Sequence, residues 1–222
     1  MPETMRIVVY DTPELAVRAA ADLFTALAPE TVALAGGSTP KALYGLLASD
    51  DYRDRTDWDR VEVFFGDERA VPPNHPDSNY GMAHKSLLDL VPADPDLVHR
   101  MEADASDLDD AADRYSQLLP ARLDLVLLGM GTDGHTASLF PGQDALDEQE
   151  RRCVPTVAPN NGRRLTLTYP TLNAARHVLF LVLGGDKKPS LDRVRSGSNL
   201  PAGRIEPANG DVTWIVDQAA FG

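Results

Sequence analysis

An aspartate and a histidine flank a glycine in the stretch GMGTDGHTASLFPG, residues 129–142. This stretch follows the apolar segment LDLVLL, residues 123–128, which predicts a buried strand. Open α/β sheets bind their ligands at the carboxyl ends of strands, which is where this glycine-rich turn is expected. Histidine titrates near neutral pH and is well suited to moving a proton. Asp133 and His135 therefore indicate an enzyme active site.

The same stretch contains the spacing G-x-G-x-x-G, formed by Gly129, Gly131 and Gly134, which is typical of dinucleotide-binding proteins. In those proteins the motif opens a full crossover helix, and an acidic residue ends the next strand about twenty residues later. Here Pro141 and Gly142 leave room for barely two helical turns. The acidic residues at the right distance lie before the next predicted strand. We therefore expect no nicotinamide or flavin cofactor.

A second glycine turn, AGGSTP at residues 35–40, directly follows the strand-like segment TVALA. Ser38 or Thr39 is expected to cap the next helix, with Pro40 in its first position. Glycines allow backbone N–H groups to approach a ligand closely, and a helix start of this kind binds anions, most often phosphate. An ordinary strand–helix connection explains the local pattern equally well.

Charged side chains follow the strand VEVFF in the segment FGDERAVPPNHPDSN, residues 65–79. Arg69 could bind phosphate or stabilise a developing oxyanion. The tripeptide of Asp67, Glu68 and Arg69, taken alone, favours a solvated charge cluster or an Asp67–Arg69 pair that holds the loop, because most surface ion pairs contribute little.

Two basic pairs stand near later strands, Arg163–Arg164 before RLTLTY and Lys187–Lys188 after VLFLVLGG. Each pair alone is explained by exposed strand and helix ends, although lysine and arginine are normal phosphate ligands. Five separate strand ends thus carry glycine or charge chemistry that suits one anionic ligand. This shared chemistry favours a common site.

Short apolar segments alternate with helical patterns, which predicts a layered α/β fold forming one domain over residues 1–222. The near-continuous apolar segments LDLVLL and VLFLVL are expected to be central, parallel strands. The predicted strands are residues 6–10, 31–35, 61–65, 123–128, 153–157, 164–168, 178–183 and 212–216. The predicted helices are residues 13–27, 40–47, 78–90, 108–118 and 187–195.

The composition argues against several classes of partner and of chemistry. With 21 basic and 34 acidic residues the net charge is −13, which argues against nucleic acid or an anionic membrane as the main partner. An anionic substrate would need a local basic cluster. A single cysteine, Cys153, and no apolar run near the roughly 20 residues of a membrane span suit the cytoplasm. Neither an H-E-x-x-H nor a G-x-S-x-G motif occurs, so we expect no metal and no serine nucleophile.

Taken in order, AGGSTP, GDERAVPPNHPDSN, GMGTDGHTASLFPG, RRLTLT and LGGDKKP resemble the 6-phosphogluconolactonases of the glucosamine-6-phosphate isomerase/6-phosphogluconolactonase family. The resemblance covers essentially the whole chain. It implies hydrolysis of 6-phospho-D-glucono-1,5-lactone to 6-phospho-D-gluconate in the oxidative pentose phosphate pathway, without a cofactor. It also implies a three-layer α/β fold with a mostly parallel sheet of Rossmann-like topology, as in glucosamine-6-phosphate deaminase and ribose-5-phosphate isomerase. We expect a monomer or a weak homodimer.

The resemblance also implies roles for individual residues. His135 would be the general base for water, oriented by Asp133 or Asp67. Arg69 and backbone N–H groups of the turn at Gly131 and Gly134 would stabilise the oxyanion. The family's arginine directly precedes the strand and its lysine follows the glycine turn by two, which selects Arg164 over Arg163 and Lys187 over Lys188. The substrate phosphate would be bound by Gly37, Ser38, Thr39, Arg164 and Lys187.

Two other functions fit the sequence less well. The related deaminases have a sequence like I-A-F-N-E-P after Gly-His, with a glutamate that assists ring opening. This chain reads HTASLFPG and has no carboxylate there, which favours the lactonase. A sugar-phosphate sensor would carry a DNA-binding helix pair or a basic patch, and neither is visible in the sequence.

Overall fold

The structure, a computed structural model, describes residues 5–222. Its centre is a six-stranded sheet in which every neighbouring pair is parallel. The strands, in spatial order, are β1 (Met5–Tyr10), β9 (Asp211–Asp217), β8 (His177–Val182), β5 (Leu125–Leu128), β2 (Thr31–Leu34) and β3 (Glu62–Phe65). The expected α/β architecture with a mostly parallel sheet is confirmed. A single domain over residues 1–222 stays a prediction.

Burial explains why the middle strands are so apolar. All four residues of β5 are buried, as are the last five of β8. A strand with neighbours on both sides and cover on both faces has no side exposed to water, so its sequence shows no polar alternation. The two apolar segments expected to be central and parallel are therefore confirmed as such.

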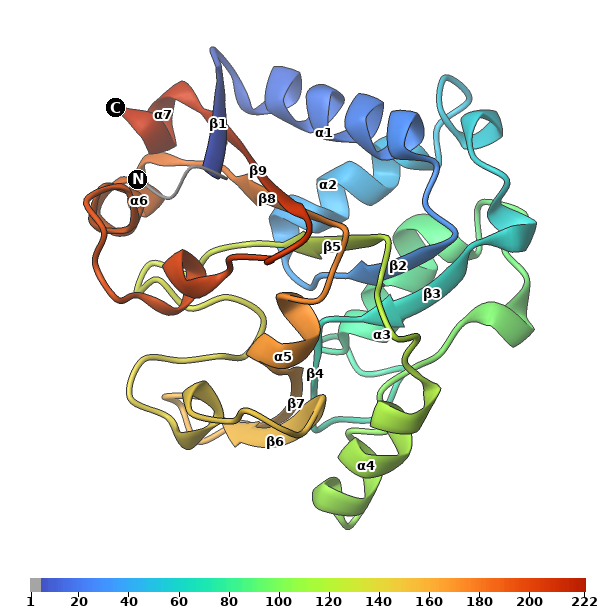
Figure 1. The fold of residues 1–222 in the computed structure, drawn as a ribbon. Coiled ribbons are helices and arrows are strands. Elements are labelled where there is room, and N and C mark those ends of the chain that lie inside the picture. Colours follow the sequence, from blue (N-terminus) through green and yellow to red (C-terminus); the bar gives the residue numbers. More distant parts are fainter. Residues whose placement is uncertain (1–4) are drawn as a thin grey trace.

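Helices cover the sheet (Figure 1). Helices α1 (Pro13–Leu27) and α2 (Ser38–Leu47) lie on one face, and the short α5 (Tyr169–Leu172) lies on the other beside a second, smaller sheet. Helix α1 begins after Thr12, whose side chain accepts a hydrogen bond from the Leu15 amide at 3.3 Å. Helix α4 (Leu108–Leu118) packs against the smaller sheet. The remaining helices are α3 (Asn79–Ala83), α6 (Lys188–Arg195) and α7 (Gln218–Phe221).

The smaller sheet is antiparallel and consists of β4 (Asp67–Arg69), β7 (Arg163–Leu167) and β6 (Cys153–Val157) in that order. The sequence predicted the last two strands but not their separation from the main sheet. It also placed Asp67–Arg69 in a loop. That expectation was wrong because a three-residue strand is stabilised by its distant partner β7, which leaves no local signal.

Two predicted helices are divided. The helix expected over residues 78–90 consists of α3 followed by a π-helical turn, η3 (His84–Leu88). The helix expected from residue 187 starts with a 3₁₀ turn, η6 (Gly185–Lys187), and α6 follows it. Within residues 5–222, no helix combines the length and apolar character required to cross a bilayer.

Candidate active site

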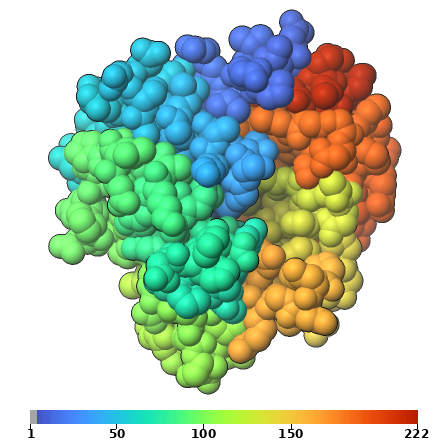
Figure 2. All heavy atoms as spheres, turned by 180° about the vertical axis from the view of Figure 1, so that it is seen from behind, coloured from blue at the N-terminus to red at the C-terminus, as the bar shows by residue number. Residues whose placement is uncertain are grey.

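A cleft of about 390 Å³ opens at the carboxyl ends of the central strands. Its walls come from the turns that follow β2, β5 and β8, and from β4 and β7 of the smaller sheet. In Figure 2 these segments, coloured blue, teal, yellow-green and orange, meet near the middle of the face shown. Strand ends far apart in the sequence thus converge as expected, although two of them belong to the second sheet.

The turn after β2 places a helix start in this cleft. Gly37 has φ +103°, a conformation that favours glycine, and is the N-cap of α2. The expected cap by Ser38 or Thr39 is wrong, as is Pro40 in the first position, because the helix already begins at Ser38 and no side chain caps it. Ser38 and Thr39 both line the cleft. An uncapped helix N-terminus leaves backbone N–H groups for an anion.

Asn79 lies against this turn at Gly36. A Cβ atom added to Gly36 would lie 2.0 Å from Asn79 Oδ1, so only glycine permits the contact. Asn79 Nδ2 donates to the backbone oxygen and to Oδ1 of Asp67, at 3.0 and 3.1 Å. One buried amide therefore joins the glycine turn of the main sheet to β4 of the smaller one.

The turn after β5 holds the imidazole of His135 at the cleft. The Asp133 carboxylate accepts hydrogen bonds from His135 Nδ1 at 2.5 Å and from the His135 amide at 3.1 Å. Nδ1 is thus engaged, which leaves Nε2 for proton transfer. Burial raises the pKa of the Asp133 carboxyl, but the hydrogen bonds and charge of His135 outweigh it and bring the pKa below its ordinary value.

Two glycines shape this turn. The Gly131 amide donates to the His135 oxygen and the Gly134 amide to the Gly131 oxygen, both at 2.9 Å. These N–H groups were expected to stabilise an oxyanion, but the turn itself already uses them. A Cβ on Gly131 would lie 2.2 Å from the imidazole, and Gly134 has φ +84°. The missing side chain of Gly131 and the positive φ of Gly134 therefore allow His135 and Asp133 to contact each other.

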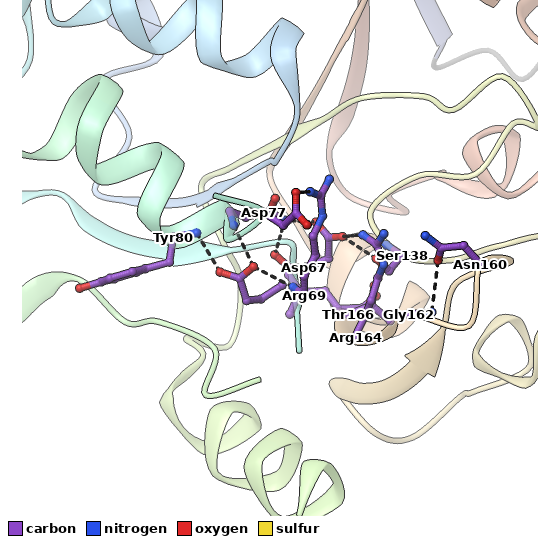
Figure 3. A network of polar contacts seen from close by, with 12 residues as sticks. Asp67, Arg69, Asp77, Tyr80, Ser138, Asn160, Gly162, Arg164 and Thr166 are labelled. Atoms are coloured by element: carbon purple, nitrogen blue, oxygen red, sulfur yellow. Dashed lines mark hydrogen bonds and ion pairs between the residues drawn. The ribbon is translucent and has the colours of Figure 1, made fainter. Parts of the chain in front are cut away.

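The smaller sheet contributes two arginines. In the β4–β7 ladder Arg69 pairs with Arg164, so both side chains lie on the same face, and both line the cleft. Arg164 lies 3.8 Å from Asp67, and Arg69 lies 3.5 Å from Asp77 rather than pairing with Asp67 (Figure 3). Burial lowers the pKa of the Arg164 guanidinium, partly offset by Asp67.

The Nε atoms of both arginines are buried and have no hydrogen-bond partner among the described residues. A buried N–H group without a partner is costly, so both arginines are held here at some cost in stability.

Asp67 belongs to a different network from His135. Its Oδ2 accepts a hydrogen bond from Ser138 Oγ at 2.5 Å (Figure 3). The Ser138 amide donates to Thr166 Oγ1 at 3.1 Å. Of the two aspartates considered as partners of the imidazole, Asp133 makes the contact and Asp67 instead ties the histidine loop to the smaller sheet. Sequence reasoning missed Asn79 and Ser138, whose polar types gave a signal but whose partners are distant.

The turn after β8 contributes a lysine. Lys187 lines the cleft, with Nζ 3.2 Å from the Asp186 carboxylate, whereas Lys188 pairs with Asp192 at 2.7 Å. Arg163 is exposed and stands outside the cleft lining. The cleft therefore receives Lys187 and Arg164, the members of each pair that the sequence selected.

Potential metal ligands and the single cysteine lie as follows. Within residues 5–222 no group of three or more potential metal ligands is gathered. Burial raises the pKa of the Cys153 thiol to about 12, so it stays protonated and is a poor nucleophile.

An α/β fold whose cleft combines an imidazole–carboxylate pair with two arginines and a lysine defines a protein that handles small anionic ligands. The chain belongs to the family described as glucosamine-6-phosphate isomerases/6-phosphogluconolactonase, whose sequence model matches residues 8–214.

Similar proteins span most of the chain. It is 42% identical to the 6-phosphogluconolactonase of a Nostoc species over 206 residues, which cover 86% of this chain and 82% of the relative. It is 35% identical to that of Haemophilus influenzae, with 86% of each covered. The solved 6-phosphogluconolactonase of Trypanosoma cruzi superposes with a TM-score of 0.86 at 30% identity, covering 99% of this chain and 97% of that one. A monomeric glucosamine-6-phosphate deaminase shares the fold, with a TM-score of 0.87 at 21% identity and with 97% and 98% covered.

Proposed function

We propose that this protein hydrolyses 6-phospho-D-glucono-1,5-lactone to 6-phospho-D-gluconate, the lactonase step of the oxidative pentose phosphate pathway. The observation that carries the proposal is the cleft itself, which presents the Asp133–His135 pair together with the cations of Arg164 and Lys187. The names of the similar proteins support it. Ester hydrolysis transfers no electrons, so the reaction needs no redox cofactor.

His135 is the general base in this proposal. A water molecule attacks the lactone carbonyl carbon while Nε2 of the imidazole takes one of its protons. Asp133 holds Nδ1 and stabilises the charged ring that results, the role that carboxylates have in catalytic triads. When the ring oxygen leaves the tetrahedral intermediate, the charged imidazole returns the proton to it.

Arg69 stabilises the negative charge that develops on the carbonyl oxygen. Arg69 lines the cleft and its side chain is partly exposed, so its terminal N–H groups are within reach of a bound ligand. A positively charged donor that is held at the site before the reaction needs little reorganisation as charge develops. The amides of Gly131 and Gly134, which bond within the turn, leave this task to the arginine.

Binding of the phosphate group positions the substrate in the cleft. The start of α2 at Gly37, Ser38 and Thr39 offers backbone N–H groups, and Arg164 and Lys187 supply positive charge. Binding energy at this remote group fixes the carbonyl relative to His135. The net charge of −13 makes this local cluster necessary for an anionic substrate.

A pH-stat assay with freshly prepared lactone, corrected for spontaneous hydrolysis, tests the proposal. We expect His135→Ala to lower kcat by about 10²- to 10⁴-fold, whereas Lys187→Ala raises mainly KM. An unchanged kcat in His135→Ala would remove the base assignment. Ammonia release from glucosamine-6-phosphate by the wild type would instead indicate a deaminase.

The proposal includes a cytoplasmic reaction by a monomer or weak homodimer that binds neither nucleic acid nor membrane. Gel filtration with light scattering measures the oligomeric state directly.

A further inference from the structure

Phe140 contacts two of the groups to which the proposed mechanism assigns roles, although it does not line the cleft. Its ring centroid lies 4.5 Å from that of the His135 imidazole, with the planes tilted by 46°. The guanidinium carbon of Arg164 lies 5.7 Å from the same centroid. The Phe140 side chain is therefore in contact with the proposed base and with one of the proposed phosphate ligands.

The two groups are carried by different parts of the fold. His135 lies on the loop after β5 of the main sheet, and Arg164 lies on β7 of the smaller sheet. Ser138, two residues before Phe140, bonds this loop to Asp67 and Thr166 of the smaller sheet. Phe140 follows that junction and adds the contact that spans from the imidazole to the guanidinium.

The surroundings of the Phe140 ring are partly polar, since it packs against an imidazole and a guanidinium. Phe140 is only 4% exposed, yet it stands outside the contiguous apolar core formed by the described residues. An imidazole and a guanidinium both pack favourably on an aromatic ring, so the ring constrains where each of them lies.

We propose that Phe140 is a positioning residue that sets the orientation of the His135 imidazole and its separation from the Arg164 guanidinium. This inference rests on the proposed function, in which one molecule places its phosphate at Arg164 and its reacting carbon at His135. The binding of a ligand that carries both a phosphate and a reacting carbon depends on that separation. The binding of inorganic phosphate does not.

The test compares two ligands by isothermal titration calorimetry. The probes are 6-phosphogluconate, which carries the phosphate and the carbon that corresponds to the lactone carbonyl, and inorganic phosphate, which carries only the phosphate. In Phe140→Leu we expect the Kd of 6-phosphogluconate to rise about tenfold and the Kd of inorganic phosphate to change by less than about twofold, since small misplacements matter only where two ends must fit together. In Phe140→Tyr, which keeps the ring, we expect both values to stay close to those of the wild type.

Phe24→Leu is the matched control, because Phe24 is fully buried and stacks on Trp58 with centroids 5.5 Å apart, outside the cleft lining. We expect it to lower the melting temperature without changing the ratio of the two Kd values. An unchanged ratio in Phe140→Leu, or an equal change in Phe24→Leu, overturns the proposal. If Phe140→Leu does not fold, Phe140→Met supplies the same comparison with a more adaptable side chain. Absence of lactone hydrolysis by the wild type would overturn the proposed function alone, because these binding measurements do not depend on turnover.

Discussion

At the scale of single residues, Asp133 and His135 act as one unit. The same carboxylate oxygen accepts from the imidazole and from the His135 amide, so Asp133 fixes both the ring and the backbone that carries it. Their spacing across Gly134 made the pair visible in the sequence, but the bond itself depends on the turn that Gly131 and Gly134 permit.

The lowered pKa of Asp133 predicts how the stability of the protein depends on pH. Because the folded pKa lies below the unfolded one, the charged carboxylate stabilises the fold above the unfolded pKa of about 3.9. This contribution is lost as the pH falls through the folded pKa. We expect Asp133→Asn to lower the free energy of unfolding at pH 7 by up to about 1 kcal/mol, a limit set by its partial exposure.

Urea unfolding at pH 7 and at several values below pH 4 measures this difference. The difference between wild type and Asp133→Asn should shrink as the pH falls. A difference that does not change with pH would show that the carboxylate charge is not responsible.

At the scale of secondary-structure elements, the start of α2 and the start of α3 meet at Gly36 and Asn79. The contact is so close that any side chain at residue 36 must displace the amide of Asn79. Asn79 in turn bonds to Asp67 on β4, so a disturbance at the glycine turn reaches the smaller sheet.

We therefore expect Gly36→Ala to raise KM for the lactone by about tenfold or more, since misplacement of binding groups is costly. Gly45→Ala is the control on the same helix, because a Cβ at residue 45 meets nothing within 4 Å. It should leave KM unchanged and raise the free energy of unfolding by about 0.5–1 kcal/mol through helix propensity. Steady-state kinetics and urea unfolding test both variants, and equal KM values would contradict the prediction.

Elements with strong local signals were predictable from the sequence. Helices α1 and α4 begin and end at the expected residues because caps and apolar periodicity determine them. The short β4 was not predictable, since its stability comes from pairing with β7 nearly a hundred residues later. The start of α2 was misplaced because a glycine with positive φ leads directly into the helix.

The candidate site likewise contains residues that were predictable from the sequence and contacts that were not. The types of His135, Arg164 and Lys187, and their places after or before strands, indicated the cleft. The partners of Asn79 and Ser138 were not predictable, because each hydrogen bond joins segments that only the folded chain brings together.

At the scale of the whole molecule, two sheets of different type share one cleft. The loop after β5 connects them through Ser138, whose hydroxyl donates to the buried Asp67 across 71 residues of sequence. A buried carboxylate that loses a donor is destabilised.

We expect Ser138→Ala to lower the free energy of unfolding by about 1–3 kcal/mol. Ser116→Ala is the control, since among residues 5–222 Ser116 Oγ bonds only to the Ala112 oxygen within α4. That change should be neutral or slightly stabilising, because alanine favours helices. Thermal and urea unfolding measure both, and similar losses in the two variants would refute a special role for the connection between sheets.

The pairing of Arg69 with Arg164 across the ladder has a consequence for stability. The two like charges repel each other, and the carboxylates of Asp77 and Asp67 offset part of this repulsion. A bound anion relieves this repulsion, so ligand occupancy and folding are linked by mass action. Under the proposed function, the free energy of unfolding therefore rises with the concentration of the phosphorylated ligand.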